Sequence, residues 1–286
     1  ALFMTSNALF QKKLRYDLSS IATVFGSIVM IIAALFLYLT TNSILPYVFI
    51  YILGGITFVL VSFTLIVEKF KQSVNPIFDT QRFGSLITLS WPIGIALILN
   101  LVYFRIDVLI LANSRSSTEV GLYGLSYQFF QAALAVPIFF ANALFPILAQ
   151  LFKKNITEFN KTIKSSLIYL TLISLGLTAF LVLVSYLIPV IYDPRYTGSG
   201  IALRILSFGM PFFFISALLW HQLIIYNKQK LLIYVYAIGA AFNLLANLIF
   251  IPIYGYIAAS TITVISEILI TMLLILSLRT IRPITS

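Results

Sequence analysis

The sequence of 286 residues contains no cysteine, a single histidine and only eight acidic residues. The lack of cysteine excludes disulfide bonds, thiolate metal sites and cysteine nucleophiles. One histidine leaves little basis for a histidine-built metal site or for a Ser–His–Asp triad. We therefore expect no metal and no cofactor, and we predict that the protein is not an enzyme.

Charged residues are scarce as a group. Asp, Glu, Lys and Arg make up 9% of the chain, against about 25% of an ordinary soluble domain, whereas 61% of the residues are hydrophobic. So few charged side chains cannot cover a soluble surface, and the composition predicts a polytopic membrane protein. In a soluble protein the net charge of +10 would suggest a nucleic-acid partner, so the positions of the basic residues have to be considered first.

Long hydrophobic runs recur along the chain. A bilayer core requires about 20 apolar residues per helix, and the runs lack the alternation of apolar and polar residues that is typical of a membrane β-barrel. The pattern predicts an all-α transmembrane helical bundle with eight spans. These spans cover residues 18–39, 45–67, 83–112, 120–152, 165–192, 201–226, 231–251 and 256–278.

The basic residues fall mainly in alternate loops between these spans. Fourteen of the 18 Lys and Arg residues lie on one predicted side, and the opposite loops hold only Arg115 and Arg195. Because Lys and Arg in short loops remain on the cytoplasmic side, we predict a multi-pass protein with a cytoplasmic C-terminus. The positive charge is therefore an orientation signal, and no nucleic-acid partner is expected.

The first ten residues are apolar and are followed by basic residues. They are too few to span a bilayer, and a signal peptide would carry its basic residues before the apolar run. We expect this segment to be the cytoplasmic end of an earlier helix, which predicts that the sequence begins inside a larger protein.

Two segments carry a resemblance to a known family. The first contains Phe83-Gly-Ser-Leu-Ile-Thr-Leu-Ser-Trp-Pro92, then Arg105-Ile-Asp107 and Val120-Gly-Leu-Tyr-Gly. The second contains Asn243-Leu-Leu-Ala-Asn247, Ile251-Pro-Ile-Tyr-Gly255 and the stretch 263–267. Together they resemble the bacterial polysaccharide-biosynthesis flippases of the multidrug/oligosaccharidyl-lipid/polysaccharide exporter superfamily.

This resemblance implies a fold of two facing six-helix bundles that work by alternating access. Residues 83–286 are then the complete second bundle, and residues 1–82 are the last two helices of the first bundle with a cytoplasmic linker. The implied location is the bacterial cytoplasmic (inner) membrane. The implied partners are the lipid bilayer, a polyprenyl-diphosphate-linked oligosaccharide for a surface polysaccharide such as O-antigen, and the polysaccharide polymerase machinery.

Ionisable residues within the spans are the first candidates for a functional site, because each costs about 2.5–3.5 kcal/mol to insert at the centre of a bilayer. Glu267 lies near the middle of the last span and is a candidate for proton or ion coupling. It could equally be a neutral side chain that hydrogen-bonds to a neighbouring helix. Asp107 is the second candidate for ion or proton coupling.

Four residues are candidates for substrate binding. Arg105 could bind a diphosphate bidentately, or it could extend to water at the membrane interface. Asn243 and Asn247 lie one helical turn apart and share a face, where they could bind sugar hydroxyls or bond across helices. Asn100 has the same two interpretations, whereas His221 is predicted to lie at the interfacial end of its span.

Three other functions remain possible alternatives at this point. A multidrug cation antiporter of the same superfamily predicts acidic residues in the bundle core, and only Glu267 meets that description. A lipid II flippase is a close relative in function. A membrane-embedded, polyprenyl-dependent glycosyltransferase or polymerase should have a large extramembrane loop with clustered acids, but the longest loop here, 68–82, is short.

Overall fold

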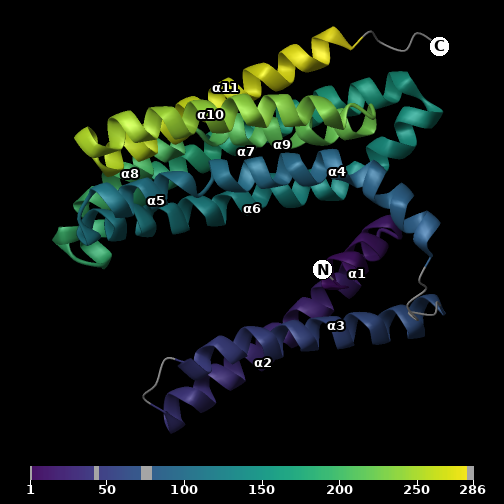
Figure 1. Cartoon of the computed structure of the whole chain (residues 1–286), viewed down its shortest axis with the longest axis horizontal. Helices are drawn as coiled ribbons and strands as arrows, with labels where there is room; N and C mark the ends of the chain where they lie inside the picture. Colours follow the sequence, from purple (N-terminus) through teal and green to yellow (C-terminus); the bar gives the residue numbers. More distant parts are fainter. Residues whose placement is uncertain (1, 42–44, 72–78, 282–286) are drawn as a thin grey trace. The chain divides into compact units, whose positions relative to one another are not determined.

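The computed structural model describes residues 2–41, 45–71 and 79–281, and every regular element in these residues is a helix. The chain divides into two compact units, residues 1–80 and residues 81–286. Each is considered by itself below (Figure 1). The division lies two residues before the predicted boundary, and the assignment of the two parts to a first and a second bundle stays a prediction.

Unit 1 contains α1 (Leu2–Lys12), α2 (Tyr16–Thr40), the short 3-10 helix η1 (Leu45–Tyr47) and α3 (Val48–Phe70). The buried side chains of Phe10, Leu18 and Ile66 join the three α-helices in a small core. Gly26 lies directly against Phe58, where a Cβ atom would overlap the phenyl ring. The missing side chain therefore lets α2 and α3 approach closely, as small residues do in membrane helix pairs.

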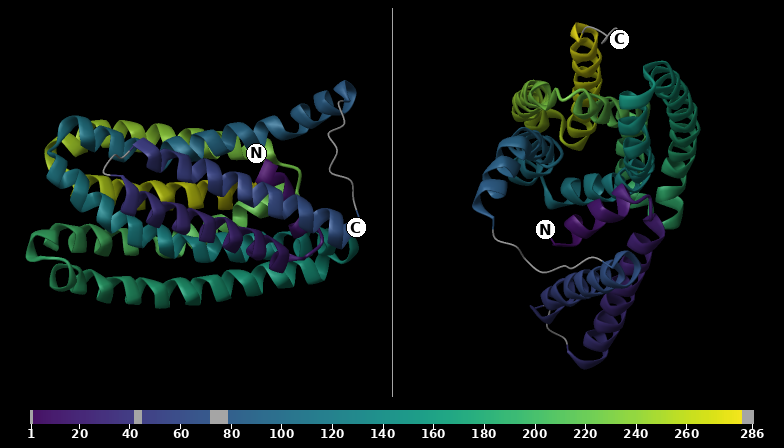
Figure 2. Two further views of the ribbon diagram at one scale, coloured as in Figure 1. Left: turned by 90° about the horizontal axis from the view of Figure 1, so that it is seen from below. Right: turned by 90° about the vertical axis from the view of Figure 1, so that its right-hand side faces the viewer.

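Unit 2 is a bundle in which long helices run back and forth between two ends (Figures 1 and 2). Its core is a continuous cluster of buried aromatic and aliphatic side chains. Its elements are α4 (Thr80–Tyr103), α5 (Ile106–Ser114), α6 (Ser117–Lys154), α7 (Ile156–Ile191), η2 (Pro194–Tyr196), α8 (Thr197–Ser207), α9 (Met210–Ile225), α10 (Gln229–Tyr254) and α11 (Tyr256–Thr280).

The described helices allow seven or eight spans, and the prediction of eight lies within this range. Seven helical segments of the described chain are long and apolar enough to cross a membrane, with α4 and α5 counted together as 83–114. The segments Pro194–Ser207 and Met210–Ile225, bent by 48° at a short break, give an eighth span when they are counted as one crossing. The chain is therefore an all-α, multi-pass membrane protein.

Two spans that hydropathy predicts as continuous are broken in the structure. The span over 201–226 breaks at Phe208 and Gly209, because Pro211 cannot continue the hydrogen-bond ladder of a preceding helix. The span over 83–112 breaks at Phe104 and Arg105, where the backbone of Arg105 leaves the helical conformation (φ −127°, ψ −17°). No proline lies at this second break, and hydropathy did not predict it.

Some helices begin earlier than hydropathy predicted. The span expected over 165–192 belongs to α7, which begins at Ile156. The side chain of Asn155 accepts a hydrogen bond from the backbone N–H of Glu158 at 3.0 Å and thereby caps the helix. Hydropathy identifies the part of a helix that lies in the membrane, whereas capping residues decide where the helix starts.

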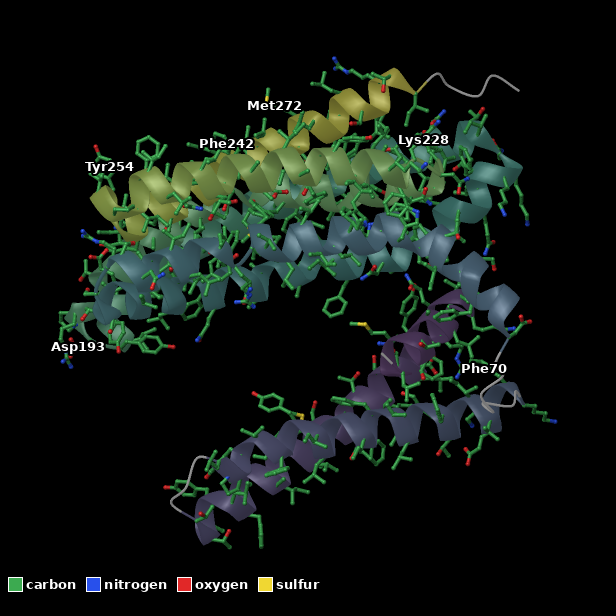
Figure 3. The ribbon with its side chains drawn as sticks, viewed as in Figure 1. Phe70, Asp193, Lys228, Phe242, Tyr254 and Met272 are labelled. Atoms are coloured by element: carbon green, nitrogen blue, oxygen red, sulfur yellow. The ribbon has the colours of Figure 1, made fainter. Side chains whose placement is uncertain are left out.

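The two ends of unit 2 differ sharply in charge. Asp193 and Tyr254 lie at the opposite end from Lys228 (Figure 3). At that end Arg195 pairs with Asp193 at 3.0 Å, and Arg115, which bonds to Pro252 O, pairs with Glu119 at 2.8 Å. The hydrogen bond from Arg195 also lowers the pKa of the Asp193 carboxyl group. At the other end, called the basic end below, the described turns and helix ends hold one acid, Glu158, and seven basic residues: Lys153, Lys154, Lys161, Lys164, Lys228, Lys230 and Arg279.

Candidate functional site

A buried carboxyl group lies where the broken helix α4–α5 meets α6 and α11. The side chain of Asp107 in the first turn of α5 is 1% exposed. Tyr123 Oη donates a hydrogen bond to its Oδ2 at 2.5 Å. The single hydroxyl hydrogen of Thr263 is shared between Ala259 O at 2.9 Å and the same Asp107 oxygen at 3.3 Å. The backbone N–H of Val108 donates to Oδ1 at 2.7 Å. Three neutral donors from three helices thus hold this carboxyl group.

A second buried carboxyl group lies one helical turn beyond Thr263 on α11. The side chain of Glu267 is 2% exposed. The hydroxyl group of Ser216 on α9 donates to its Oε1, and Tyr103 Oη at the end of α4 donates to its Oε2 at 3.1 Å. Neither Glu267 nor Asp107 takes part in an ion pair among the described residues. Both acids are therefore held by neutral groups alone.

The two carboxyl groups belong to one hydrogen-bond network. Tyr103 Oη lies 3.3 Å from the carbonyl oxygen of Thr263 as well as 3.1 Å from Glu267. Thr263 in turn bonds to Asp107 through its hydroxyl group. A change of charge at one acid can therefore reach the other through Tyr103 and Thr263. Tyr103 precedes the α4–α5 break, Asp107 follows it, and Thr263 on α11 contacts both residues.

The two asparagines of α10 face α11 beside this network. Asn243 and Asn247 are fully buried. Asn247 Nδ2 donates to Asn243 Oδ1 at 2.8 Å, and Asn243 Nδ2 donates to Ser266 Oγ at 3.1 Å. Asn247 Oδ1 is buried without a hydrogen-bond partner among the described residues. The pair bonds across helices and also leaves one free amide oxygen in the bundle.

A cavity of about 240 Å³ has Glu267 in its wall. It brings Glu267 together with Asn100, another residue that the sequence singled out. His221 also lines this cavity: its ring contacts Ala217 O at 2.7 Å and Asn142 Oδ1 at 3.3 Å, so the ring faces the bundle and not the predicted interface. Four aromatic side chains also line this cavity: Phe104, Phe213, Trp220 and Tyr236.

Arg105 does not join this network. Its side chain is exposed beside the helix break, and its guanidinium group makes no hydrogen bond or ion pair with the described residues. Asp107, two residues further on, points into the bundle. The two charged groups therefore have separate surroundings, as their spacing predicts.

The hydroxyl groups that hold the two acids were missed from the sequence. Tyr103, Tyr123 and Ser216 lie within apolar spans, where one hydroxyl side chain is not distinguishable from the others. The only available signal was Thr263, which lies four residues before Glu267 and therefore shares its helix face. The remaining donors come from helices whose packing could not be predicted from spacing.

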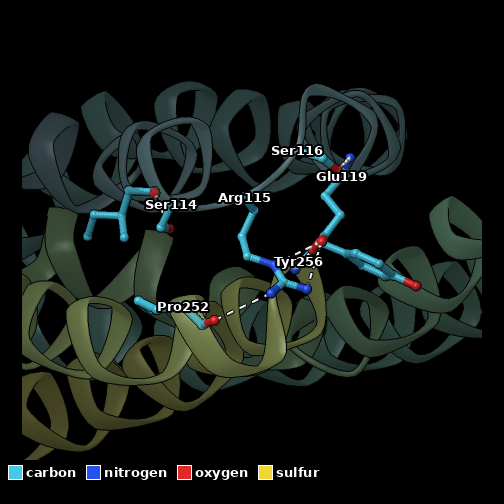
Figure 4. Close-up of polar contacts among 7 residues, drawn as sticks. Ser114, Arg115, Ser116, Glu119, Pro252 and Tyr256 are labelled. Carbon is cyan, nitrogen blue, oxygen red and sulfur yellow. Dashed lines mark hydrogen bonds and ion pairs between the residues drawn. The ribbon is translucent and has the colours of Figure 1, made fainter.

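A group of polar contacts, called the clasp below, lies at the end of unit 2 that is opposite to the basic end (Figure 4). Arg115 pairs with Glu119 at 2.8 Å, and Arg115 Nη1 donates to Pro252 O at 3.4 Å. The backbone N–H of Tyr256 donates to Glu119 Oε2 at 3.4 Å. Gly255 lies against the same carboxylate with φ +58°. The clasp joins the α5–α6 turn to the α10–α11 turn and so fixes the helices that carry both buried acids.

Two family models match the chain. One, described as polysaccharide biosynthesis protein, matches residues 2–152, and the other, described as MatE, matches residues 92–249. Each match covers more than half of the sequence. The chain belongs to the polysaccharide biosynthesis protein family of the multidrug/oligosaccharidyl-lipid/polysaccharide exporter superfamily. The matched families are transporters and not enzymes, which agrees with the prediction from the sequence.

Solved structures share the fold of this family member. The lipid II flippase MurJ in an inward closed conformation matches with a TM-score of 0.67 and 18% identity, over 97% of this chain and 59% of that one. A mutant of the MATE transporter VcmN of Vibrio cholerae matches with a TM-score of 0.78 and 15% identity, over 98% of this chain and 66% of that one.

A curated relative shares a shorter stretch of sequence. The uncharacterized membrane protein MJ1068 of Methanocaldococcus jannaschii is 29% identical over 126 residues, which are 42% of this chain and 24% of that protein. The chain therefore spans less than two thirds of the relatives' lengths, at most 66% in these three comparisons.

Proposed function

We propose that this chain is part of a flippase that moves an undecaprenyl-diphosphate-linked oligosaccharide across the bacterial inner membrane for surface polysaccharide synthesis. Membership of the polysaccharide biosynthesis protein family supports this substrate class. Unit 2 would be the complete second bundle and unit 1 the last two helices of the first bundle, with the basic end of unit 2 in the cytoplasm. The two bundles would alternate in exposing a cavity to either side of the membrane.

The observation that carries the proposal is that two buried carboxyl groups, Asp107 and Glu267, belong to one hydrogen-bond network at a broken helix. Discontinuous helices near the midplane form the ion and substrate sites of many secondary transporters. Intramembrane acids without a basic partner are costly to retain. Asp107 and Glu267 meet both conditions, because each is held only by neutral donors and the network crosses the α4–α5 break.

In this mechanism a proton or a cation supplies the energy. A charged carboxylate accepts all of its surrounding hydroxyl hydrogens, whereas a protonated carboxyl group must itself donate one. Loading or unloading Glu267 would therefore rearrange Tyr103 and Ser216, which belong to α4 and α9. The unpaired amide oxygen of Asn247, which bonds to Asn243 through its amide nitrogen, would add a ligand for a cation in the bundle. Asn100 and Arg105 would contact the substrate.

A second candidate function is export of organic cations. The cavity beside Glu267 is lined by four aromatic side chains, and aromatic faces together with a carboxylate attract organic cations. The match to the MatE model over residues 92–249 also favours it. Lipid II is a further possible cargo of the same lipid-diphosphate class, given the likeness of fold to MurJ.

Reconstitution into liposomes tests these proposals. The full-length protein should move a fluorescent undecaprenyl-diphosphate oligosaccharide to the other leaflet when a proton or sodium gradient is imposed, as measured by quenching from outside. We expect Glu267→Gln to abolish gradient-driven movement, because an amide neither takes up a proton nor carries a charge that could bind a cation. Glu158→Gln, which removes an exposed carboxylate at the basic end, should transport normally.

The competing outcomes are distinct. Gradient-driven uptake of ethidium without movement of the lipid would favour the cation antiporter. Faster movement of lipid II than of the undecaprenyl-diphosphate oligosaccharide would identify lipid II as the transported lipid. Full activity of Glu267→Gln would reject the role of Glu267 in coupling.

A further inference from the structure

A second, larger cavity opens at the basic end of unit 2 and shares no residue with the cavity beside Glu267. Its volume is about 1200 Å³. Its walls come from α4, the α6–α7 junction, the α9–α10 turn and the end of α11. We call it the basic-end cavity. The transport mechanism proposed above makes no use of it.

The polar wall of this cavity is built to contact an anion. Lys228 and Lys230 line it, and no acidic residue does so among the described residues. Both lysines are exposed, and neither makes an ion pair with a described residue. Additional hydrogen-bond donors come from the side chains of Asn160, Gln222 and Gln229. The site therefore offers two free positive charges and several neutral donors.

The remaining wall is apolar and suits a hydrocarbon chain. Leu89 and Pro92 of α4 face the cavity, as do Leu231 of α10 and Leu278 of α11. A soluble anion would gain nothing from such a surface, whereas a lipid would place its headgroup at the lysines and its first methylene groups on these residues. Basic pockets between transmembrane helices bind anionic lipid headgroups in this manner.

Hydrogen bonds and a ring contact stabilise the turn that carries the two lysines. The backbone N–H of Lys228 donates to Leu223 O at 2.9 Å, and Lys228 O accepts from the N–H of Leu231 at 2.9 Å. The ring of Tyr226 packs against Phe152, with ring centroids 5.2 Å apart, and its hydroxyl group accepts from Gln222 Nε2 at 3.1 Å. The backbone around the lysines is therefore fixed before any ligand arrives.

We propose that the basic-end cavity binds the phosphate group of an anionic membrane lipid, with Lys228 and Lys230 as its charged contacts. Two lipids carry this chemistry: a resident anionic phospholipid, and the phosphate-bearing end of a polyprenyl lipid. The proposal does not rest on the proposed transport function, because binding at this cavity can be measured without movement across the membrane.

Lipid binding to the purified full chain tests the proposal. Phosphatidylglycerol, undecaprenyl phosphate, phosphatidylcholine and soluble glycerol phosphate are titrated separately, and the bound fraction is measured by native mass spectrometry. The double variant Lys228→Gln, Lys230→Gln should bind the anionic lipids about thirtyfold more weakly, because each lysine near a lipid headgroup contributes about 1 kcal/mol. The control variant Lys161→Gln, Lys164→Gln removes the same charge from exposed sites outside the cavity and should change affinity less than twofold.

Each result has a defined meaning. Tighter binding of undecaprenyl phosphate identifies the polyprenyl lipid as the occupant, and tighter binding of phosphatidylglycerol identifies the phospholipid. Equal weakening by the two double variants, or no weakening by either, would overturn the proposal and leave the lysines as orientation signals. Binding of glycerol phosphate as tight as that of the lipids would contradict the lipid assignment. The single variant Lys230→Gln, with an expected fivefold loss, serves if the double variant does not fold.

Discussion

At the scale of single residues, the two buried acids differ from the other charged groups in how the free-energy cost of removing the carboxylate from water is offset. Exposed acids such as Asp193 pair with an arginine in water, where such pairs contribute about 0–1 kcal/mol. Asp107 and Glu267 are surrounded by hydroxyl groups and a backbone N–H. Neutral donors stabilise a carboxylate without neutralising it, so each acid keeps the capacity to bind a proton or a cation.

Arg105 allows a sharp test at this scale. If its guanidinium group binds the diphosphate of the substrate through two parallel hydrogen bonds, Arg105→Lys should lower the transport rate about tenfold, because lysine keeps the charge but loses the bidentate geometry. The liposome assay measures the rate. Arg195→Lys, an exposed site paired with Asp193, is the matched control. An unchanged rate for Arg105→Lys would mean that the side chain only extends to water.

How far the sequence predicted the site can be judged from these residues. Glu267 and Asp107 were selected because a charge in an apolar span is rare, and both prove to be buried in one network. The same rule also selected Arg105, which is exposed. Hydropathy shows that a charged residue lies within a span, but it does not show whether that residue faces the bundle or the surroundings. It also carries no information on which hydroxyl groups act as hydrogen-bond donors.

At the scale of helices and turns, the clasp and the two breaks decide the geometry. Asp107, in the first turn of α5 after the α4–α5 break, points into the bundle, whereas Arg105 at the break is exposed. The clasp of Arg115 and Glu119 then fixes α5 and α6 to the turn between α10 and α11. The sequence indicated a turn near Gly255, but the partner of that turn, 136 residues earlier in the chain, followed only from the packing.

Gly255→Ala should weaken this clasp. The backbone there has φ +58° and ψ −138°, a conformation that only glycine adopts readily, and a Cβ atom would overlap the Glu119 carboxylate. Strain of this kind costs about 1–3 kcal/mol, which lowers the midpoint of thermal unfolding by about 2–4 °C per kcal/mol in a chain of this size. Scanning fluorimetry of the purified protein measures the shift.

Gly124→Ala is the matched control for that experiment. Gly124 lies within α6 and has open space around it, so alanine should be neutral or slightly stabilising there. A Gly255→Ala protein as stable as the Gly124→Ala protein would show that the clasp does not depend on the close approach at Gly255.

At the scale of the whole molecule, charge asymmetry and the lack of cysteine together allow the orientation to be measured. Seven basic residues and one acid lie at the basic end of unit 2, whereas the opposite end has its arginines paired with acids. Because the chain has no cysteine, a single introduced cysteine is the only thiol. Lys161→Cys should react with a membrane-impermeant maleimide only after the cells are opened.

The paired variant Asp193→Cys should react in intact cells, because Asp193 lies at the opposite end (Figure 3). Mass shift on a gel measures both reactions. The reverse pattern would invert the proposed orientation and would place the basic-end cavity outside the cytoplasm.

The sequence by itself determined that this is a helical, multi-pass membrane protein, and it predicts eight spans and their orientation. These properties depend on local composition: the length of an apolar run and the position of its flanking charges. The tertiary structure decided which groups meet. Asp107 reaches Tyr123 and Thr263, and Glu267 reaches Tyr103 and Ser216, across separations of 16 to 164 residues. Such contacts arise from helix packing and from one break without a proline, and neither leaves a periodic signal in the sequence.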